Sequence, residues 1–459
     1  MKNILLQYCT FYLAILLLSP SILAQNTAPY VDKSGQFKVF DNGKIHGLEH
    51  EEVTEVKIGG DYVIYKDEAG QKKQYFNGET KDINNLPNVS HHPTRYLMGI
   101  VEGLKGETLK VQYADSEELL SIDMDKGAFA TRDSVLVFKD NYGELTVFYE
   151  GKTHLLGEDL NCRVSSNSVV FMDSTNVMSL FHEGKVTEIY REKVKNHYEF
   201  GFAARGAFGD DKEFENPAAS KNKEMASKIK KTGQMRPDLF RASQAVLTYE
   251  GKKFRSKSIS YKHYLLTAPN DFLRKTINCR PSYVTCWYAA PYHVGDNFVV
   301  FVDENGKLIA YDEGILSEVA DFQPKNYRVG AKMIIFVDEF DALMVYWNGK
   351  TQKLTESFPR FQAIKKNTLV YADDLGFFHV FDKGKKITLE AYQPSYVAMN
   401  EGIVVYTDRD GLLKAYYEGK KLDISKVIVK NFQLIGRVIL YTVGNNETKI
   451  FYNGNHYSG

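Results

Sequence analysis

The sequence predicts an all-β repeat protein, and three observations lead to this prediction. The stretch VFVDENGKLIAYDEG at residues 300–314 returns in similar form at 335–349, 370–384 and 405–419. The segments between its turns are rich in β-branched and aromatic residues, which favour strands. No window of useful length within these copies shows the 3.6-residue spacing of an amphipathic helix. Self-similarity at one fixed period is typical of a repeat architecture.

The period is 35 residues, and several columns keep it. An aspartate opens the first turn of each copy and a glycine ends the second turn; these residues are Asp303, Asp338, Asp373, Asp408, Gly314, Gly349, Gly384 and Gly419. We interpret them as structural turn residues, because aspartate accepts hydrogen bonds from the amides that follow it and glycine tolerates positive φ. The turns lack the third ligand position and the distal acid of a calcium loop, so we predict no metal ligands there.

Each unit reads as four short strands. In the copy around Asp373, the first three strands are NTLVYAD at 367–373, GFFHVFDKG at 376–384 and KKITLE at 385–390. The segment after the repeated proline, such as NYRVG at 326–330, is a weaker fourth strand. The first half of the chain contains the same unit, with clear copies at residues 137–152 and 170–185.

One small sheet of four antiparallel strands cannot bury both of its faces, so the copies must stack. Radial stacking gives a β-propeller, and the chain resembles the β-propeller repeat class over roughly residues 30–190 and 294–459. Its blades are shorter than the roughly 40–50 residues of common propeller repeats, and the G-H and W-D signature is missing, so no named family follows. The resemblance implies four-stranded antiparallel blades in one large or two smaller rings. A β-solenoid or a rolled β-shell remains the alternative.

The chain divides into four segments. Residues 1–24 read as a secretory signal peptide, with a basic start, an apolar run and a small residue at Ala24. Residues 25–195 are predicted as N-terminal propeller repeats, 196–297 as a degenerate, irregular basic region, and 298–459 as C-terminal propeller repeats. The markers indicate about a dozen units, and the offset ends suit ring closure by strands from both termini. We therefore expect an exported protein, periplasmic or secreted, without a transmembrane segment once the signal is removed.

The irregular region differs from the repeats in composition. Between residues 221 and 275 there are fourteen Lys or Arg and four acids, a net charge of +10, whereas the whole chain has 58 of each. Degenerate blades with long polar loops, an inserted or interdomain segment and a coding-sequence error all remain open. A basic run is usually a solvated surface, although it could dock an acidic glycan or a lipid headgroup.

Three cysteines follow the signal peptide. Cys279 and Cys286 are close enough in sequence for a local disulfide, which an exported protein can form. Cys162 would stay free, and we expect it to be buried in a strand or turn. The adjacent pair His91 and His92 is interpreted as part of a loop with no metal role.

The sequence contains no recognisable catalytic apparatus. It has no phosphate-binding loop, no dinucleotide fingerprint, no H-E-x-x-H and no G-x-S-x-G. We therefore predict no catalytic, cofactor-binding or metal residues, no cofactor and no nucleic-acid partner. The function expected is that of a non-catalytic scaffold of the cell envelope or exterior that binds an unknown protein or polysaccharide. An extracellular glycan lyase or hydrolase on a propeller is the alternative.

Overall fold

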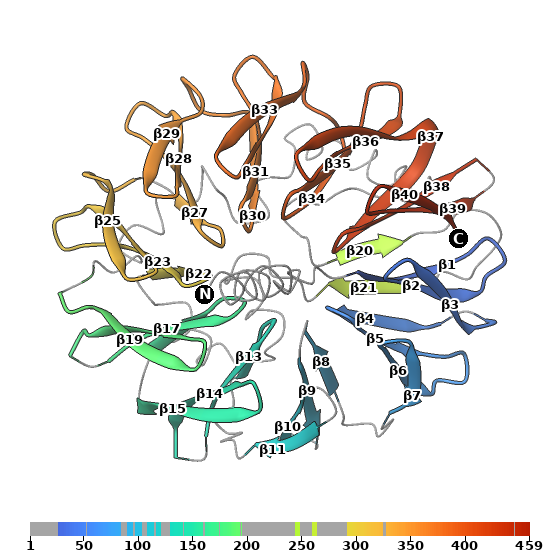
Figure 1. Cartoon of the computed structure of the whole chain (residues 1–459), viewed down its shortest axis with the longest axis horizontal. Coiled ribbons are helices and arrows are strands. Elements are labelled where there is room, and N and C mark those ends of the chain that lie inside the picture. Colours follow the sequence, from blue (N-terminus) through green and yellow to red (C-terminus); the bar gives the residue numbers. More distant parts are fainter. Residues whose placement is uncertain are drawn as a thin grey trace, which may run out of the picture.

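The computed structural model describes residues 26–51, 53–83, 90–94, 97–102, 108–113, 116–120, 129–140, 142–158, 161–173, 175–192, 194, 244–247, 259–263, 292–324, 327–444 and 446–459. These residues form strands and turns only. Figure 1 shows the strands as blades arranged around one ring, in chain order, with the last blade beside the first. The prediction of an all-β propeller is confirmed. Of the two arrangements left open by the sequence, one large ring or two smaller rings, the structure shows one large ring.

The strands of the first half form five blades. Blade 1 contains β1 (Thr27–Val31), β2 (Phe37–Asp41) and β3 (Lys44–Glu49). Blade 2 contains β4 (Glu55–Gly59), β5 (Tyr62–Lys66), β6 (Lys72–Phe76) and β7 (Glu79–Asp82). Blade 3 contains β8 (Ser90–Pro93), β9 (Leu97–Glu102), β10 (Thr108–Tyr113) and β11 (Ser116–Leu120). Blade 4 contains β12 (Phe129–Thr131), β13 (Val135–Lys139), β14 (Glu144–Tyr149) and β15 (Lys152–Glu158). Blade 5 contains β16 (Asn161–Val164), β17 (Ser168–Met172), β18 (Met178–His182) and β19 (Lys185–Tyr190).

The second half forms five more. Blade 6 contains β22 (Tyr292–Gly295), β23 (Phe298–Val302), β24 (Leu308–Asp312) and β25 (Ile315–Ala320). Blade 7 contains β26 (Tyr327–Val329), β27 (Met333–Val337), β28 (Leu343–Trp347) and β29 (Lys350–Lys353). Blade 8 contains β30 (Phe361–Lys365), β31 (Thr368–Ala372), β32 (Phe378–Asp382) and β33 (Lys385–Glu390). Blade 9 contains β34 (Val397–Asn400), β35 (Ile403–Thr407), β36 (Leu412–Tyr417) and the start of β37 (Lys420–Ile435). Blade 10 contains the end of β37, β38 (Val438–Val443), β39 (Glu447–Tyr452) and β40 (Asn455–Ser458).

Every complete blade contains a four-stranded antiparallel meander, and the first strands labelled in Figure 1 for β8, β22, β30 and β34 lie nearest the ring centre. The segment after each repeated proline, expected as a fourth strand, is therefore the first strand of the following blade, as for β26 and β34. Ten blades are present in the described chain rather than about a dozen. Blade 1 shows three strands, and no described strand of blade 1 pairs with one of blade 10.

The meander assigns the turns to two faces of the ring. Turns between the first and second strands, and between the third and fourth, lie on one side, which we call the inner-turn face. Turns between the second and third strands, together with the connections between blades, lie on the opposite side, which we call the aspartate-turn face. An ion pair supports this assignment. Lys332, in the turn between the first two strands of blade 7, pairs with Glu313, in the turn between the third and fourth strands of blade 6.

The core lies between the blades. One buried cluster joins Ile435 and Leu440 of blade 10 to Phe40 of blade 1 and to Val63 and Tyr75 of blade 2. A second joins blade 5 directly to blade 6, although residues 195–291 separate them in sequence. The ring is thus closed by side-chain packing of alternate strand residues, as the phased aromatic columns indicate.

Two strands of the predicted irregular region are described. β20 (Gln244–Leu247) and β21 (Ile259–His263) form an antiparallel pair, and β21 runs parallel to β4, which extends blade 2 to six strands. The remainder of residues 196–291 lies outside the described residues, as do the signal peptide and both cysteines of the expected disulfide.

Two smaller expectations have different outcomes. Cys162 lies in β16 with 2% of its surface exposed, as expected of a buried strand residue, and its thiol is free. His91 and His92 lie in β8 rather than in a loop, so that prediction is wrong. The strand forms because both residues pair with β9, opposite Ile100 and Gly99.

Candidate functional site

The four predicted aspartates occupy the same position in four successive blades. Each side chain accepts a hydrogen bond from the backbone N–H four residues ahead, at 2.8 Å for Asp303, Asp338 and Asp373 and at 2.9 Å for Asp408. The aspartate C=O accepts the N–H of the third residue after it, as Gly376 donates to Asp373 at 3.0 Å. Each turn thus closes on its own aspartate, and the two residues after it stay at the surface.

The second carboxylate oxygen of several turn aspartates is also engaged. A basic side chain six residues ahead reaches it from the next strand: Lys38 lies 2.7 Å from Asp32, Lys414 lies 3.2 Å from Asp408, and His379 Nε2 lies 3.0 Å from Asp373. Burial would raise the pKa of Asp32, but hydrogen bonds from Lys38, Ser34 and the backbone outweigh it and lower the pKa to about 2. Among the described residues, no three His, Cys, Asp or Glu side chains are arranged to hold a metal ion.

The predicted glycines lie on the opposite face. Gly314, Gly349, Gly384 and Gly419 have φ of 97°, 76°, 80° and 84°, and the residue before each also has positive φ, such as 49° at Asn348. Two consecutive positive φ values define a type I′ hairpin turn, which glycine forms without steric cost. The structure therefore places the aspartates and glycines around two faces of the ring and brings them together in no single pocket.

Ser168, His182 and Glu183 look at first like a serine–histidine–acid arrangement. Ser168 Oγ lies 2.9 Å from His182 Nδ1, and His182 Nε2 lies 3.7 Å from Glu183. Ser168 is fully buried, however, and its Oγ accepts the N–H of Asn297 from the neighbouring blade at 3.0 Å.

The same position in other blades explains this contact. Thr368 Oγ1 lies 3.5 Å from Asp382 and accepts the N–H of Gly402 from the next blade at 2.7 Å, and Thr27 Oγ1 lies 3.3 Å from Asp41. All three pairs are 14 residues apart. Ser168 therefore belongs to a hydroxyl column that joins adjacent blades, and the arrangement is structural rather than catalytic.

A second inter-blade contact was not visible in the sequence. Tyr75 OH donates to Asp41 at 2.8 Å, and Tyr416 OH donates to Asp382 at 2.9 Å, each across one blade boundary. Beside these pairs, Glu49 accepts hydrogen bonds from Tyr65 and Lys73, as Glu390 does from Tyr406 and Lys414. The only signal in the sequence is that all of these residues recur at a common offset of 341 positions.

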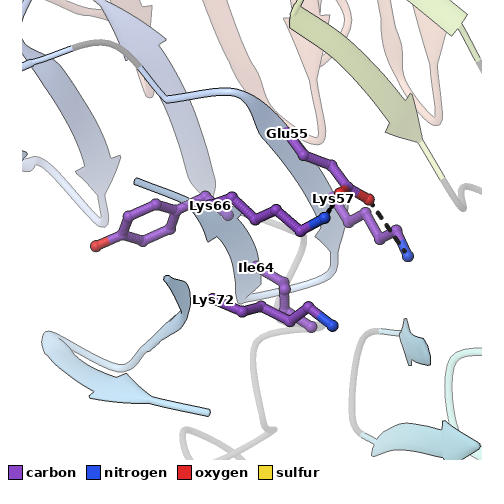
Figure 2. A pocket seen from close by; sticks show the side chains of 6 residues that line it. Glu55, Lys57, Ile64, Lys66 and Lys72 are labelled. Carbon is purple, nitrogen blue, oxygen red and sulfur yellow. Dashed lines mark ion pairs between the residues drawn. The ribbon is translucent and has the colours of Figure 1, made fainter. Parts of the chain in front are cut away.

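A cleft on blade 2 gathers cationic side chains (Figure 2). It is lined by Glu55, Lys57, Ile64, Tyr65, Lys66 and Lys72. The Glu55 carboxylate pairs with Lys66 at 2.9 Å and with Lys57 at 3.7 Å. Burial, with a contribution from Lys66, lowers the pKa of Lys72. Three ammonium groups against one carboxylate favour a small anion over a cation, but supply no nucleophile paired with a base.

Polar side chains on the first strands of neighbouring blades also contact one another. Arg163 Nη1 lies 3.5 Å from His293 Nδ1, and the rings of His293 and Tyr327 stand edge-on with centroids 4.9 Å apart. At the end of β30, burial and the neighbouring Lys366 lower the pKa of Lys365 to about 8, although Asp133 opposes the shift. These groups come from different blades, and within the described residues they do not form an acid–base pair around a common cavity.

Comparison with solved structures finds several similar chains, all at low identity and low TM-score. A computationally designed protein, Ika8, is 14% identical with a TM-score of 0.27, and the match covers 80% of this chain and 96% of that one. The GH74 xyloglucanase from Xanthomonas campestris is 10% identical with a TM-score of 0.26, covering 94% and 83%. PorZ, a surface component of the type-IX secretion system of Porphyromonas gingivalis, is 11% identical with a TM-score of 0.22, covering 94% and 75%. At these scores none of the three bears on function, and no curated protein matches the chain.

A family model describes most of the sequence. The model of a 10-bladed β-propeller domain matches residues 21–257 and 285–457, and the gap between the two matched parts, residues 258–284, lies within the segment between blades 5 and 6. Its blade number agrees with the ten blades of the described chain. The chain therefore belongs to the ten-bladed β-propeller family.

Proposed function

We propose that this protein is an exported, non-catalytic β-propeller that serves as an interaction scaffold for a protein or polysaccharide of the cell envelope or exterior. The observation that carries the proposal is the contrast within each aspartate turn. The aspartate and its hydrogen bonds recur from blade to blade, whereas the two exposed residues after it change, as in Glu304–Asn305, Glu339–Phe340 and Asp374–Leu375. A rigid frame that presents variable loops is suited to recognition.

Two further features support the proposal. The N-terminal leader favours export, and the described residues include no helix long and apolar enough to cross a membrane. The four turn aspartates are engaged in the fold, and the contact between Ser168 and His182 is explained by blade packing. Fold alone does not decide function, because propellers also host enzymes.

The test is an incubation of the purified protein with a panel of polysaccharides and peptides, with and without divalent cations. We expect capture of at least one member of the panel without chemical change. Turnover that one substitution on the aspartate-turn face abolishes would overturn the proposal in favour of the glycan lyase or hydrolase alternative. A Ser168→Ala variant that retains any turnover would exclude the serine–histidine contact as its source.

A further inference from the structure

The aspartate-turn face of blades 7 and 8 exposes four large apolar side chains. Phe340 is 74% exposed and Leu375 is 72% exposed, and both stand two residues after the aspartate of their turns. Phe358 and Phe377 are 39% and 38% exposed. We call these four residues the apolar patch.

The connection between the two blades places these residues on one stretch of the ring. It begins on blade 7, where Thr355 Oγ1 accepts the N–H of Leu343 at 2.9 Å. It ends on blade 8, where the N–H of Arg360 donates to Ala372 O at 2.9 Å. Phe358 lies between these anchor points, on the connection from blade 7 to blade 8, and so on the same face as the turns that carry Phe340, Leu375 and Phe377.

The fold does not require apolar residues at these positions. The residue two places after the turn aspartate is polar or small in five other blades: Ser34, Ala69, Thr175, Asn305 and Asp410. Blade 4 has Tyr142 there, isolated from the patch by its position in the ring. Contiguous exposed apolar side chains on a folded protein mark interaction sites, whereas single ones do not.

The charges beside the patch indicate what it binds. Glu339 and Asp374 directly precede Phe340 and Leu375, and both are exposed. Arg360 is an exposed cation whose guanidinium lies beside Gly376 of the blade 8 turn, and Glu356 at the same connection pairs with Lys353. Acids therefore predominate around the apolar side chains, and a second copy docking through the same patch would bring like charges together.

We propose that the apolar patch docks a protein segment that presents aliphatic or aromatic side chains flanked by lysine or arginine. The apolar groups supply the buried contact and the partner's cations meet Glu339 and Asp374, which sets the choice of partner. This inference rests on the proposed scaffold function and assigns the binding of the partner to the apolar patch on blades 7 and 8.

The experiment uses three labelled synthetic peptides and the purified protein. The first peptide has an apolar core between lysines (KKLFLFKK), the second has the same core between glutamates (EELFLFEE), and the third has a polar core between lysines (KKSGSGKK). Fluorescence anisotropy should show the first binding at least tenfold more tightly than the other two. Phe340→Ser combined with Leu375→Ser should weaken it at least tenfold, while the matched variant Tyr142→Ser on blade 4 should leave it unchanged.

Reversing the charge beside the patch should strengthen the binding of one peptide and weaken that of another. Glu339→Lys combined with Asp374→Lys should invert the preference, so that the glutamate-flanked peptide binds more tightly. Glu68→Lys, at the same turn position on blade 2, serves as the control and should invert nothing. The melting temperature of each variant is expected to stay at the parent value, because these side chains are exposed.

The following results would contradict the proposal that the apolar patch docks a protein segment. Equal binding of the three peptides, or equal loss in Tyr142→Ser, overturns it. Self-association that disappears in Phe340→Ser, measured by sedimentation, would replace the protein partner by a second copy. If the patch variants change no peptide affinity while a panel polysaccharide still binds without turnover, this inference fails and the scaffold function stands.

Discussion

The two faces of the ring are held together in different ways. On the inner-turn face, neighbouring blades bond to each other: Asp296 N–H donates to Ala331 O at 2.8 Å, and Ala331 N–H donates to Lys366 O at 3.1 Å. On the aspartate-turn face, each turn satisfies its backbone with its own carboxylate, as Asp338 does. Substitutions on the first face therefore disturb two blades, whereas exposed residues on the second can change without a structural cost. This difference explains why we assign recognition to the aspartate-turn face.

The largest effect is expected where two blades approach most closely. A Cβ added to Gly330 would lie 1.8 Å from the backbone oxygen of Lys366 in the next blade, so the blades must shift. Gly330→Ala should lower the free energy of unfolding by about 3 kcal/mol or more, measured by urea titration. Gly47→Ala is the control, because nothing lies within 4 Å of its added Cβ. Equal stability of the two variants would contradict the tight inter-blade approach.

A smaller effect on stability is expected in the turns between the third and fourth strands, which lie on the same face. Gly384 has φ of +80°, and an added Cβ would lie 3.2 Å from Trp347 Cδ1 of the adjacent blade. Gly384→Val should cost on the order of 1–3 kcal/mol, because a β-branched residue resists positive φ. Gly419→Val, with φ of +84° and no such neighbour, separates the two causes. A melting curve unchanged in both variants would refute the structural role of these glycines.

On the aspartate-turn face, stability should depend on acid pH. The folded pKa of Asp32 is about 2 against an ordinary value of 3.8. A depressed pKa means stabilisation that is present above pH 4 and is lost as the pH falls towards 2. Asp32→Asn should therefore cost roughly 2 kcal/mol at pH 6 and much less near pH 2, since one pKa unit corresponds to about 1.4 kcal/mol. A stability difference that stays constant across this range would exclude the ionised Asp32 as its source.

The smallest of these effects concerns the hydroxyl column. Ser168→Ala removes the acceptor of the Asn297 N–H, and Thr368→Ala removes that of Gly402. Each should cost about 1–2 kcal/mol, because a backbone N–H between blades loses its hydrogen bond. Similar losses in both variants, followed by thermal unfolding, would support one structural role for the column. A loss confined to Ser168→Ala would point instead to a special function of that residue.

The sequence predicted the residues that repeat in every unit, but not the contacts that join one blade to the next. The aspartate and glycine columns could be read because one residue type recurs every 35 positions. The segment that ends at Gly330 was predicted as the fourth strand of one blade but forms the first strand of the next. The sequence could not show this, because the pairing of strands depends on which segments are neighbours in space. The Tyr416–Asp382 bond joins two blades through residue types that occur throughout the chain, so it left no distinctive pattern. Phe340 was visible only as variation in a turn, since exposure cannot be read from one copy.

The long strand β37 gives the last two blades a mechanical link that the others lack. Its residues 420–423 pair with β36 and its residues 429–435 pair with β38, so one unbroken strand belongs to two sheets. The described connections after blades 7 and 8, residues 354–360 and 391–396, are loops instead, which can extend without disturbing the next sheet. Tension that extracts β38 from blade 10 acts directly on the edge of blade 9. Under load these two blades would therefore yield together as one cooperative step, while the remaining blades could detach one at a time.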